Sequence, residues 1–452
     1  MAAPVPGRCG FFVKKKQRFC KMIVAKDKKF CGEHATMDEN SSIKRIVCPL
    51  DPKHTVCEDK LQKHLKKCNS REKPKPVYYV QDINAGSAEG DKQIQVSLCD
   101  RSRSQLQSLV DKLKKAVEGF QCDLEDRFLS HPVFEEELNN PKNGESAHKH
   151  LKQQSSLLAH MDALGLLGRG RCFVEFGAGK GKLSHWIHEA LKTSMVCHEH
   201  ETHNLPNTCS EPKSNDQLQF LLVERSSTRF KVDGKHQETG VQFERLQVDI
   251  QHLDLSKVPL LSQQPPLVGV GKHLCGAATD LSLRCLLDTP GLTEEPPPKR
   301  LKTSGQSDPA GGDTESSSPG PVLGLVVALC CHHRCEWRHY VGQRFFQQRG
   351  LGAEEFEAFS RMSSWATCGL RATDRSGDQD EHEPAEETDA VNGFLSAEER
   401  HQVGRLCKLL IDSGRLHFLQ SRGFSGKLTQ YISSDVTLEN VMLTAVPSSS
   451  TS

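Results

Sequence analysis

The sequence lacks long hydrophobic runs. No stretch approaches the roughly 18 consecutive apolar residues that indicate a membrane-spanning helix. The lysines at Lys14–Lys16 are not followed by the apolar segment of a secretory signal peptide. We therefore expect an intracellular protein, cytoplasmic or nuclear or both, with no membrane partner. In that reducing environment the 18 cysteines are expected to be metal ligands or free thiols, because disulfide frameworks belong to oxidising compartments.

The chain also has little net charge, formally +1 over 452 residues, but its charges are unevenly distributed. Residues 1–80 contain 19 lysines and arginines against 8 acidic residues, so the remaining residues carry a net charge near −10. A basic segment attached to an otherwise neutral protein indicates a nucleic-acid partner, with a merely solvated surface as the alternative. The length is sufficient for two or three domains.

A glycine-rich segment, RCFVEFGAGKGKL at Arg171–Leu183, lacks features that phosphate and dinucleotide sites require. A P-loop needs wider glycine spacing and a Ser or Thr after its lysine, whereas Leu183 follows Lys182. A dinucleotide fingerprint needs its third glycine where Lys182 stands. The remaining pattern, E-x-G-x-G-x-G, resembles that of S-adenosylmethionine-dependent methyltransferases; the alternative is an ordinary strand-to-helix turn. The candidate cofactor-binding residues here are Glu175, Gly177, Gly179 and Gly181.

The residues around this loop predict the opening unit of a doubly wound α/β domain. Cys172–Phe176 is typical of a buried parallel strand, and apolar residues then recur at helical spacing. In such a sheet, ligands bind beyond the carboxyl ends of the strands. Glu224, after the second strand, is where an acid usually binds a nucleotide ribose, and Asp249, after the third, is expected near the adenine. The fourth and fifth strands end near Lys272-His273 and His332-His333, and residues 428–432 and 441–446 are expected to form an antiparallel pair.

Two groups of cysteine and histidine near the N-terminus predict structural zinc sites. The first group is Cys9, Cys20, Cys31 and His34, in a lysine-rich segment with little apolar material. The second is Cys48, His54, His64 and Cys68, in which His64 and Cys68 share one helix face. This second group resembles a CHHC finger found in a minor-spliceosome subunit and a few RNA-modifying proteins. Cys57 lies outside its pattern. We expect two zinc ions per chain, and basic residues in both fingers are placed to contact phosphates.

Composition predicts the domain boundaries. We expect a CCCH finger at 7–35, a CHHC finger at 45–70, a linker and helical segment at 71–148, and a catalytic domain at 149–446. Within the catalytic domain, polar or Pro/Ser/Gly/Glu-rich stretches at about 196–217, 288–320 and 371–390 are predicted to be disordered insertions.

Several motifs together resemble one family, the eukaryotic tRNA 2′-O-methyltransferases that modify the fourth nucleotide of the acceptor stem. The motifs are the two fingers in this order, EFGAGKGKLS at 175–184, KHLCGAATDL at 272–281, ALCCHHRCEW at 328–337, MSSWAT at 362–367 and VTLENVML at 436–443. The resemblance covers residues 7–68 and about 150–445. It implies a Rossmann-like class I methyltransferase fold, S-adenosylmethionine as methyl donor, a ribose 2′-hydroxyl as acceptor, and tRNA as substrate.

The end of the fourth strand agrees with an oxygen acceptor. Amino-group methyltransferases usually carry [DNS]-P-P-[YFW] there, whereas this chain reads KHLCG. A 2′-hydroxyl is a weak acid, so a base or a nearby cation should help to remove its proton. The candidate catalytic residues are Lys272, His273, His332 and His333, with Lys272 as the electrostatic aid and one histidine beside it. Two alternatives stay open: an RNA-binding finger protein with a degenerate methyltransferase fold, and a methyltransferase acting on a protein or small molecule.

Overall fold

The computed structural model separates the chain into two compact units, Met1–Pro76 and Val77–Ser452, which are described one at a time. No helix in the described part of the chain is both long and apolar enough to cross a membrane. The residues that the structure describes are 5–14, 17–26, 28–37, 44–68, 70–71, 74–86, 97–120, 124–201, 217–226, 240–288, 321–367 and 394–448.

The first unit consists of two short antiparallel hairpins with turns around them. Its strands are β1 (Phe12–Val13), β2 (Arg18–Phe19), β3 (Arg45–Cys48) and β4 (Asp51–Cys57), and its helix is α1 (Leu61–Leu65). The pairs are β1 with β2 and β3 with β4. So small a unit buries few apolar side chains, and its most buried residues include Cys9, Cys31, Cys48 and Cys68. Candidate metal ligands therefore occupy the positions that a hydrophobic core would fill in a larger domain.

The described residues of the second unit form an eight-stranded mixed sheet. Its strands are β5 (Glu125–Asp126), β6 (Cys172–Phe176), β7 (Leu218–Glu224), β8 (Val241–Gln247), β9 (Leu267–Cys275), β10 (Val322–Cys330), β11 (Phe424–Gln430) and β12 (Val441–Pro447). Their order across the sheet is β5-β11-β12-β10-β9-β6-β7-β8. The first strand predicted from sequence, Cys172–Phe176, is β6 with the same bounds.

The five strands β8-β7-β6-β9-β10 run parallel to one another. β12 pairs antiparallel with both β10 and β11, which confirms the predicted antiparallel pair. The chain builds the sheet outward in one direction from β6 through β7 to β8, and then in the other from β9 to β10. The loops after β6 and β9 therefore leave on opposite sides of a crevice at the carboxyl edge, where open α/β sheets bind ligands.

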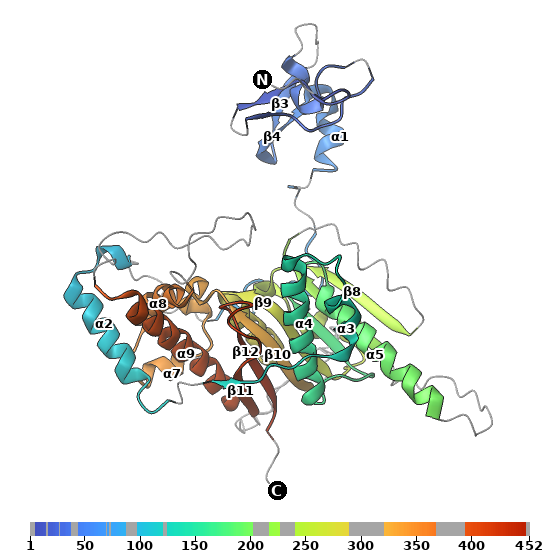
Figure 1. The fold of residues 1–452 in the computed structure, drawn as a ribbon. Helices are drawn as coiled ribbons and strands as arrows, with labels where there is room; N and C mark the ends of the chain where they lie inside the picture. Colours follow the sequence, from blue (N-terminus) through green and yellow to red (C-terminus); the bar gives the residue numbers. More distant parts are fainter. Residues whose placement is uncertain are drawn as a thin grey trace, which may run out of the picture. The chain divides into compact units, whose positions relative to one another are not determined.

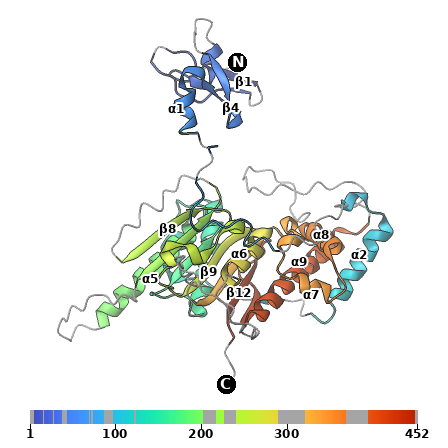
Figure 2. The ribbon, with the colours of Figure 1, turned by 180° about the vertical axis from the view of Figure 1, so that it is seen from behind.

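Helices cover both faces of the sheet (Figures 1 and 2). The side chains of α4 and α5 pack on one face, and those of α6 and the end of α9 pack on the other. Alternation along β6 explains the two layers, since Phe173 belongs to one core while Cys172 and Val174 belong to the other. The helices are α2 (Arg103–Ala116), α3 (Glu135–Leu138), α4 (Glu145–Ala163), α5 (Lys182–Glu201), α6 (Ala277–Leu287), α7 (Gln343–Gln347), α8 (Ala353–Met362) and α9 (Ala397–Ser421).

A third apolar core lies beside the sheet, where α2, α7 and α8 surround the first half of α9 (Figure 1). Aromatic rings fill it, among them Tyr340, Phe346 and Phe356, whose centroids are 4.4–5.5 Å apart. A capping box begins α9: the Ser396 hydroxyl accepts from the Glu399 amide, and the Glu399 carboxylate accepts from the Ser396 amide.

The structure differs from the sequence prediction in the segment 71–148. Residues predicted as a linker pack on the second unit: the Val80 amide donates to the His252 carbonyl at 2.8 Å. The buried Asn84 side chain donates to two carbonyls, those of Ile250 and Leu253. The second compact unit accordingly begins at Val77 and includes most of this segment. The amide of Asn84 satisfies carbonyls that a buried loop would otherwise leave without partners, which explains the attachment.

The predicted insertions lie largely outside the described residues. The first of them was predicted at about 196–217, yet α5 continues to Glu201. Residues 202–216, 289–320 and 368–393 are not among those described. The fourth parallel strand, β9, includes Lys272 and His273 and ends two residues later, at Cys275.

Candidate active site and zinc-binding fingers

The glycine loop joins β6 to α5 at the carboxyl edge of the sheet. Gly177, Gly179 and Gly181 all have positive φ, at +62°, +49° and +71°. Side chains disfavour this conformation, so glycine is required at each position. At Gly177 a Cβ atom would also lie only 3.0 Å from Cδ2 of Leu274, on β9. The loop therefore combines a tight turn with close packing against β9.

Glu175 holds the loop to the start of α5. Its Oε2 accepts hydrogen bonds from the Ser184 amide at 3.0 Å and from the Ser184 hydroxyl at 2.5 Å. Burial raises the pKa of Glu175 to about 7, against the opposing effects of the Ser184 hydrogen bonds and of the charges of Arg245 and Lys272. This carboxylate satisfies a free amide in the first turn of the helix. Its predicted contact with a cofactor stays a prediction.

Glu224 reaches the glycine loop from the end of β7. Its Oε2 accepts from the Gly179 amide at 3.0 Å, and its Oε1 accepts from the Ser226 amide at 2.8 Å. Asp249 follows the neighbouring strand β8, accepts from the Gln251 amide at 3.1 Å, and lies 3.5 Å from the Arg225 guanidinium. The two acids predicted for the cofactor therefore follow adjacent strand ends.

Arg245, on β8, is a residue at this loop that sequence reasoning missed. Its Nη1 donates to the Gly179 carbonyl at 3.0 Å. Gly179 is thus held on both sides, by Arg245 at its carbonyl and by Glu224 at its amide. In the sequence, Arg245 is one charged residue in a strand that contains both polar and apolar residues, and this pattern does not indicate which group the arginine contacts.

Lys272 and His273 meet two side chains of α4. Lys272 Nζ lies 3.1 Å from His150 Nδ1, and His273 Nε2 lies 3.2 Å from Gln153 Oε1. His273 has a φ of +62°, at an irregularity in the pairing of β9 with β10. This bend lets consecutive residues of β9 both reach α4, although side chains normally alternate along a strand. We name these four residues (His150, Gln153, Lys272 and His273) the α4–β9 cluster.

The α4–β9 cluster lies beside the glycine loop. Phe176, the last residue of β6, pairs with Gly271, which immediately precedes Lys272. The charge of Lys272 also opposes the rise in the pKa of Glu175 that burial causes. Gln153 is fully buried, and among the described residues its Nε2 has no hydrogen-bond partner. Buried amides are rarely left unpaired, so this nitrogen is an exception among the buried polar groups of the unit.

His332 takes part in a separate, buried ionic network. Its Nε2 lies 2.8 and 2.9 Å from the two carboxylate oxygens of Asp412. Asp412 also pairs with Arg415, which bonds Asp280 on α6. Burial by itself raises the pKa of Asp412, but the charges and hydrogen bonds of His332 and Arg415 bring it below its ordinary value. His332 therefore bonds to α9 and not to the α4–β9 cluster, and His333 beside it is half-buried.

A cavity of about 480 Å³ lies between α9 and the hairpin of β11 and β12, away from the glycine loop. Its lining includes Arg405, Lys408, Asp412 and Asn440. The ion pair of Lys408 with Glu439, 2.6 Å apart, lies at this hairpin. Asp412, which pairs with His332, is part of this lining, whereas none of the four residues of the α4–β9 cluster is.

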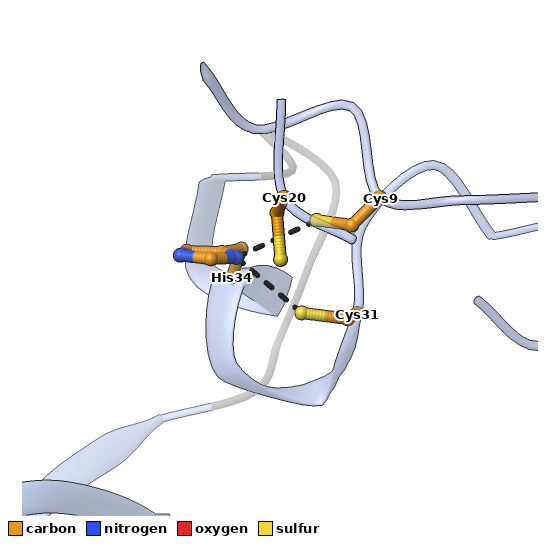
Figure 3. A group of neighbouring side chains, drawn as sticks. All are labelled: Cys9, Cys20, Cys31 and His34. Atoms are coloured by element: carbon orange, nitrogen blue, oxygen red, sulfur yellow. Dashed lines mark hydrogen bonds between the residues drawn. The ribbon is translucent and has the colours of Figure 1, made fainter. Parts of the chain in front are cut away.

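The first predicted ligand group comes together as expected. The Cys9 and Cys31 thiols lie 3.4 and 3.3 Å from His34 Nδ1, and the Cys20 thiol points into the same space (Figure 3). All four ligand atoms are within 4.8 Å of one another. A tetrahedral zinc ion with bonds of about 2.3 Å to sulfur and about 2.1 Å to nitrogen sets ligand atoms roughly 3.5 Å apart. These residues therefore fit zinc.

The second ligand group is similarly compact. Cys48 Sγ lies 3.2 Å from His64 Nε2 and 3.8 Å from Cys68 Sγ, and the two histidine Nε2 atoms are 3.1 Å apart. Cys57 is not part of the group and contacts the Arg45 guanidinium instead.

Arg45 also joins the two fingers. From β3 of the second finger it donates to the Gly32 carbonyl at 2.5 Å and pairs with Glu33 at 2.9 Å, both in the first finger. Its Nε bonds the Thr55 hydroxyl at 2.9 Å, which fixes the guanidinium on its own finger. The two fingers therefore pack against each other as one unit rather than as independent domains.

Comparisons with known proteins agree with this geometry. A family model described as methyltransferase TRM13 matches residues 152–446, more than half of the chain. The chain belongs to the TRM13 methyltransferase family. The fingers match as well: residues 7–35 match the CCCH zinc finger in TRM13 protein, and residues 45–69 match the U11-48K-like CHHC zinc finger. The TRM13 family implies S-adenosylmethionine as methyl donor, and the finger families imply zinc.

Curated relatives extend along nearly the whole chain. The proteins named tRNA:m(4)X modification enzyme TRM13 homolog from Mus musculus and Homo sapiens are each 50% identical to it. The alignment with the mouse protein covers 98% of this chain and 95% of the mouse protein. The alignment with the human protein covers 99% of this chain and 96% of the human protein. The Saccharomyces cerevisiae enzyme tRNA:m(4)X modification enzyme TRM13 is 28% identical over 96% of this chain and 95% of its own length. No solved structure matches the chain.

Proposed function

We propose that this TRM13 methyltransferase transfers the methyl group of S-adenosylmethionine to the ribose 2′-hydroxyl of nucleotide 4 in the tRNA acceptor stem. The choice of an oxygen acceptor rests on the contact between Lys272 Nζ and His150 Nδ1, which are 3.1 Å apart. Lys272 lies close to the glycine loop, because the residue before it, Gly271, pairs with the last residue of β6. A paired amine and imidazole suit a weakly acidic hydroxyl. The names of the relatives support tRNA as the substrate.

We further propose that the catalytic domain is a Rossmann-like class I methyltransferase domain. The support is the strand order β8-β7-β6-β9-β10, which is 3-2-1-4-5 when the parallel strands are numbered along the chain. This is the doubly wound order, with a switch point between β6 and β9. The antiparallel β12 inserted between β10 and β11 completes the sheet.

The proposed cofactor site follows from this switch point. Gly177, Gly179 and Gly181 let the backbone approach the ligand, and the first turn of α5 faces it. Glu224 would accept hydrogen bonds from the ribose hydroxyls, and Asp249 would lie at the adenine. The bound cofactor supplies an electrophilic methyl group on its sulfonium.

The proposed proton transfer rests on the α4–β9 cluster. Lys272 and His150 share a hydrogen bond, so one of them can accept the proton of the 2′-hydroxyl while the other stabilises the charge. Gln153 is close to His273 Nε2 and so helps to fix the position of this imidazole. Holding hydroxyl and methyl in line supplies much of the remaining rate enhancement. His332 is bound to Asp412, which makes it a positioning residue in this scheme, and His333 stays an alternative base.

The finger unit is proposed to bind the acceptor stem. Its exposed lysines are suited to phosphate contacts that carry no sequence information. An A-form stem displays its 2′-hydroxyls in a shallow minor groove, so a catalytic domain can reach one without flipping a base. The exposed lysines of this unit include Lys14, Lys28, Lys29, Lys63, Lys66 and Lys67.

Alkaline hydrolysis tests the position of the methyl group. We expect the protein with S-adenosylmethionine to make one acceptor-stem linkage of tRNA resistant to alkali, because the 2′-hydroxyl that attacks the phosphodiester is then methylated. A tRNA with a 2′-deoxy nucleotide at position 4 should accept no methyl group. Transfer to that 2′-deoxy tRNA would place the methyl on a base, and transfer to protein alone would point to another substrate class; either result contradicts the proposal.

Metal analysis tests the zinc sites. We propose that each finger holds one zinc ion. His64→Ala should remove one zinc ion relative to the parent chain, because His64 contacts both Cys48 and His54. In the same His64→Ala variant, tRNA binding should weaken. It should also depend less on salt, because fewer phosphate contacts release fewer counterions. Cys57→Ser, a change outside the ligand group, should keep the parental zinc content. Equal zinc in the His64→Ala and parent proteins would refute this assignment.

A further inference from the structure

Three cysteines outside the fingers meet at the carboxyl edge of the sheet. Cys275 ends β9, Cys330 ends β10, and Cys331 follows directly. Cys275 and Cys330 are partners in the pairing of these parallel strands. Cys330 Sγ lies 3.8 Å from Cys275 Sγ and 3.2 Å from Cys331 Sγ, and all three sulfurs are within 4.8 Å of one another. We call these residues the trithiol cluster.

The backbone is shaped to bring these thiols together. Adjacent residues of a strand point to opposite faces, so neighbouring thiols do not normally touch. Cys331 has a φ of +50°, a left-handed conformation that residues with side chains seldom adopt. Such outliers persist where the surrounding structure requires them, and they concentrate at binding sites. The turn at Cys331 places its sulfur against that of Cys330.

Cys330 and Cys331 are buried and Cys275 is half-buried, but the trithiol cluster differs from the buried cysteines elsewhere in this unit. Cys172 and Cys285 pack in the apolar core on one face of the sheet, and Cys335 and Cys407 pack in the helical core. Within the described residues, none of the three trithiol residues belongs to an apolar core cluster. They are thus not accounted for as hydrophobic packing, the usual role of a buried free cysteine.

The distance between the sulfurs of Cys275 and Cys330, 3.8 Å, matches that in a candidate zinc site of the same chain, whereas the sulfurs of Cys330 and Cys331 are closer, at 3.2 Å. Cys48 and Cys68 of the second finger also have sulfurs 3.8 Å apart. A tetrahedral ion with Zn–S bonds of about 2.3 Å sets its sulfurs about 3.8 Å apart. Three thiolates select soft metal ions and disfavour Mg²⁺ or Ca²⁺, which take oxygen ligands.

We propose that Cys275, Cys330 and Cys331 form a third metal site that binds a soft, thiophilic ion of the Zn²⁺ or Cu⁺ class. On binding, each thiol releases its proton to water as its sulfur bonds to the metal. Three protein ligands leave one position open on Zn²⁺ and complete a trigonal site for Cu⁺. The ion would connect the end of β9 to the end of β10, just past Lys272 and His273. The His273 carbonyl lies 3.6 Å from Cys275 Sγ. This proposal does not depend on the identity of the methyl acceptor.

Cadmium serves as the probe, because Cd²⁺ binds thiolates and gives a sulfur-to-metal absorption band. Reduced full-length protein is loaded with Cd²⁺, and loosely held ions are removed with a chelator. We expect the parent to retain one ion more than its two fingers hold. Cys275→Ser should lose that ion and part of the absorption band, whereas Cys285→Ala, which removes a buried thiol outside the cluster, should retain it.

Cadmium NMR of the parent chain gives a second measurement that requires no variant. The first finger offers three sulfur ligands and one nitrogen, and the second offers two sulfurs and two nitrogens. We expect a third cadmium resonance, of sulfur-rich ligation, in addition to the two resonances of the fingers. A parent that retains only the finger ions and shows only two resonances overturns the proposal. An intact mass showing Cys330 and Cys331 already joined in a disulfide, with no third ion bound, overturns it as well.

Discussion

Gly179→Arg is expected to abolish the binding of S-adenosylmethionine while leaving tRNA binding largely intact. Gly179 has a φ of +49°, and its amide and carbonyl are held by Glu224 and Arg245. A side chain here would project into open space, since the nearest atom to an added Cβ is the Gly177 carbonyl oxygen at 4.0 Å. That open space is the proposed cofactor site, so the arginine would occupy it. Isothermal titration calorimetry with the cofactor measures the effect.

A matched control separates steric blocking from backbone strain. Gly119 also has a positive φ, +80°, with nothing within 4 Å of an added Cβ, and it lies just after α2, away from the glycine loop. Gly119→Arg should carry a comparable conformational cost, of order 1–3 kcal/mol, yet bind the cofactor like the parent. Cofactor binding by folded Gly179→Arg protein at the parental affinity would mean that the methyl donor binds elsewhere.

Lys272→Ala is expected to lower kcat by about 10²–10⁴-fold, the range typical of a group that takes part in proton transfer. Its Nζ contacts His150 and belongs to the α4–β9 cluster, so the variant loses both the cation and the partner of the imidazole. Cofactor affinity should change little, because the hydrogen bonds of the glycine loop are made by Glu175, Glu224 and Arg245. Single-turnover methyl transfer to tRNA, with cofactor binding measured separately, checks both parts.

Two further variants define what Lys272 does. Lys272→Arg keeps the positive charge but cannot give up a proton near neutral pH. It should retain much of the rate if Lys272 acts as an electrostatic aid to His150, and little if Lys272 is itself the base. Lys257→Ala removes a lysine whose partner is Asp254 at 3.3 Å, outside the cluster, and should behave like the parent. A Lys272→Ala enzyme with parental kcat would remove the α4–β9 cluster from the mechanism.

The sequence alone determined the features that depend on short-range pattern. Cys172–Phe176 is recognisable as a central strand because a parallel strand covered on both faces is continuously buried, and the glycines after it have φ values that only glycine adopts readily. The two zinc ligand groups follow from the same kind of information. In so small a unit the spacing of Cys and His along the chain nearly fixes which of them can meet. The family and the methyl donor could be predicted from these local patterns.

Only the tertiary structure decided which distant side chains meet. His150 and Gln153 reach β9 because α4 packs across the sheet and because β9 bends at His273, more than a hundred residues later in the chain. His332 was grouped with Lys272 from sequence, yet it bonds to Asp412 on α9. Hydrophobic periodicity indicates which face of an element is buried but not what packs against it, and a bulge reverses the side-chain alternation on which strand predictions depend. The partners of Lys272, His332 and the trithiol cluster are therefore set by packing and strand register.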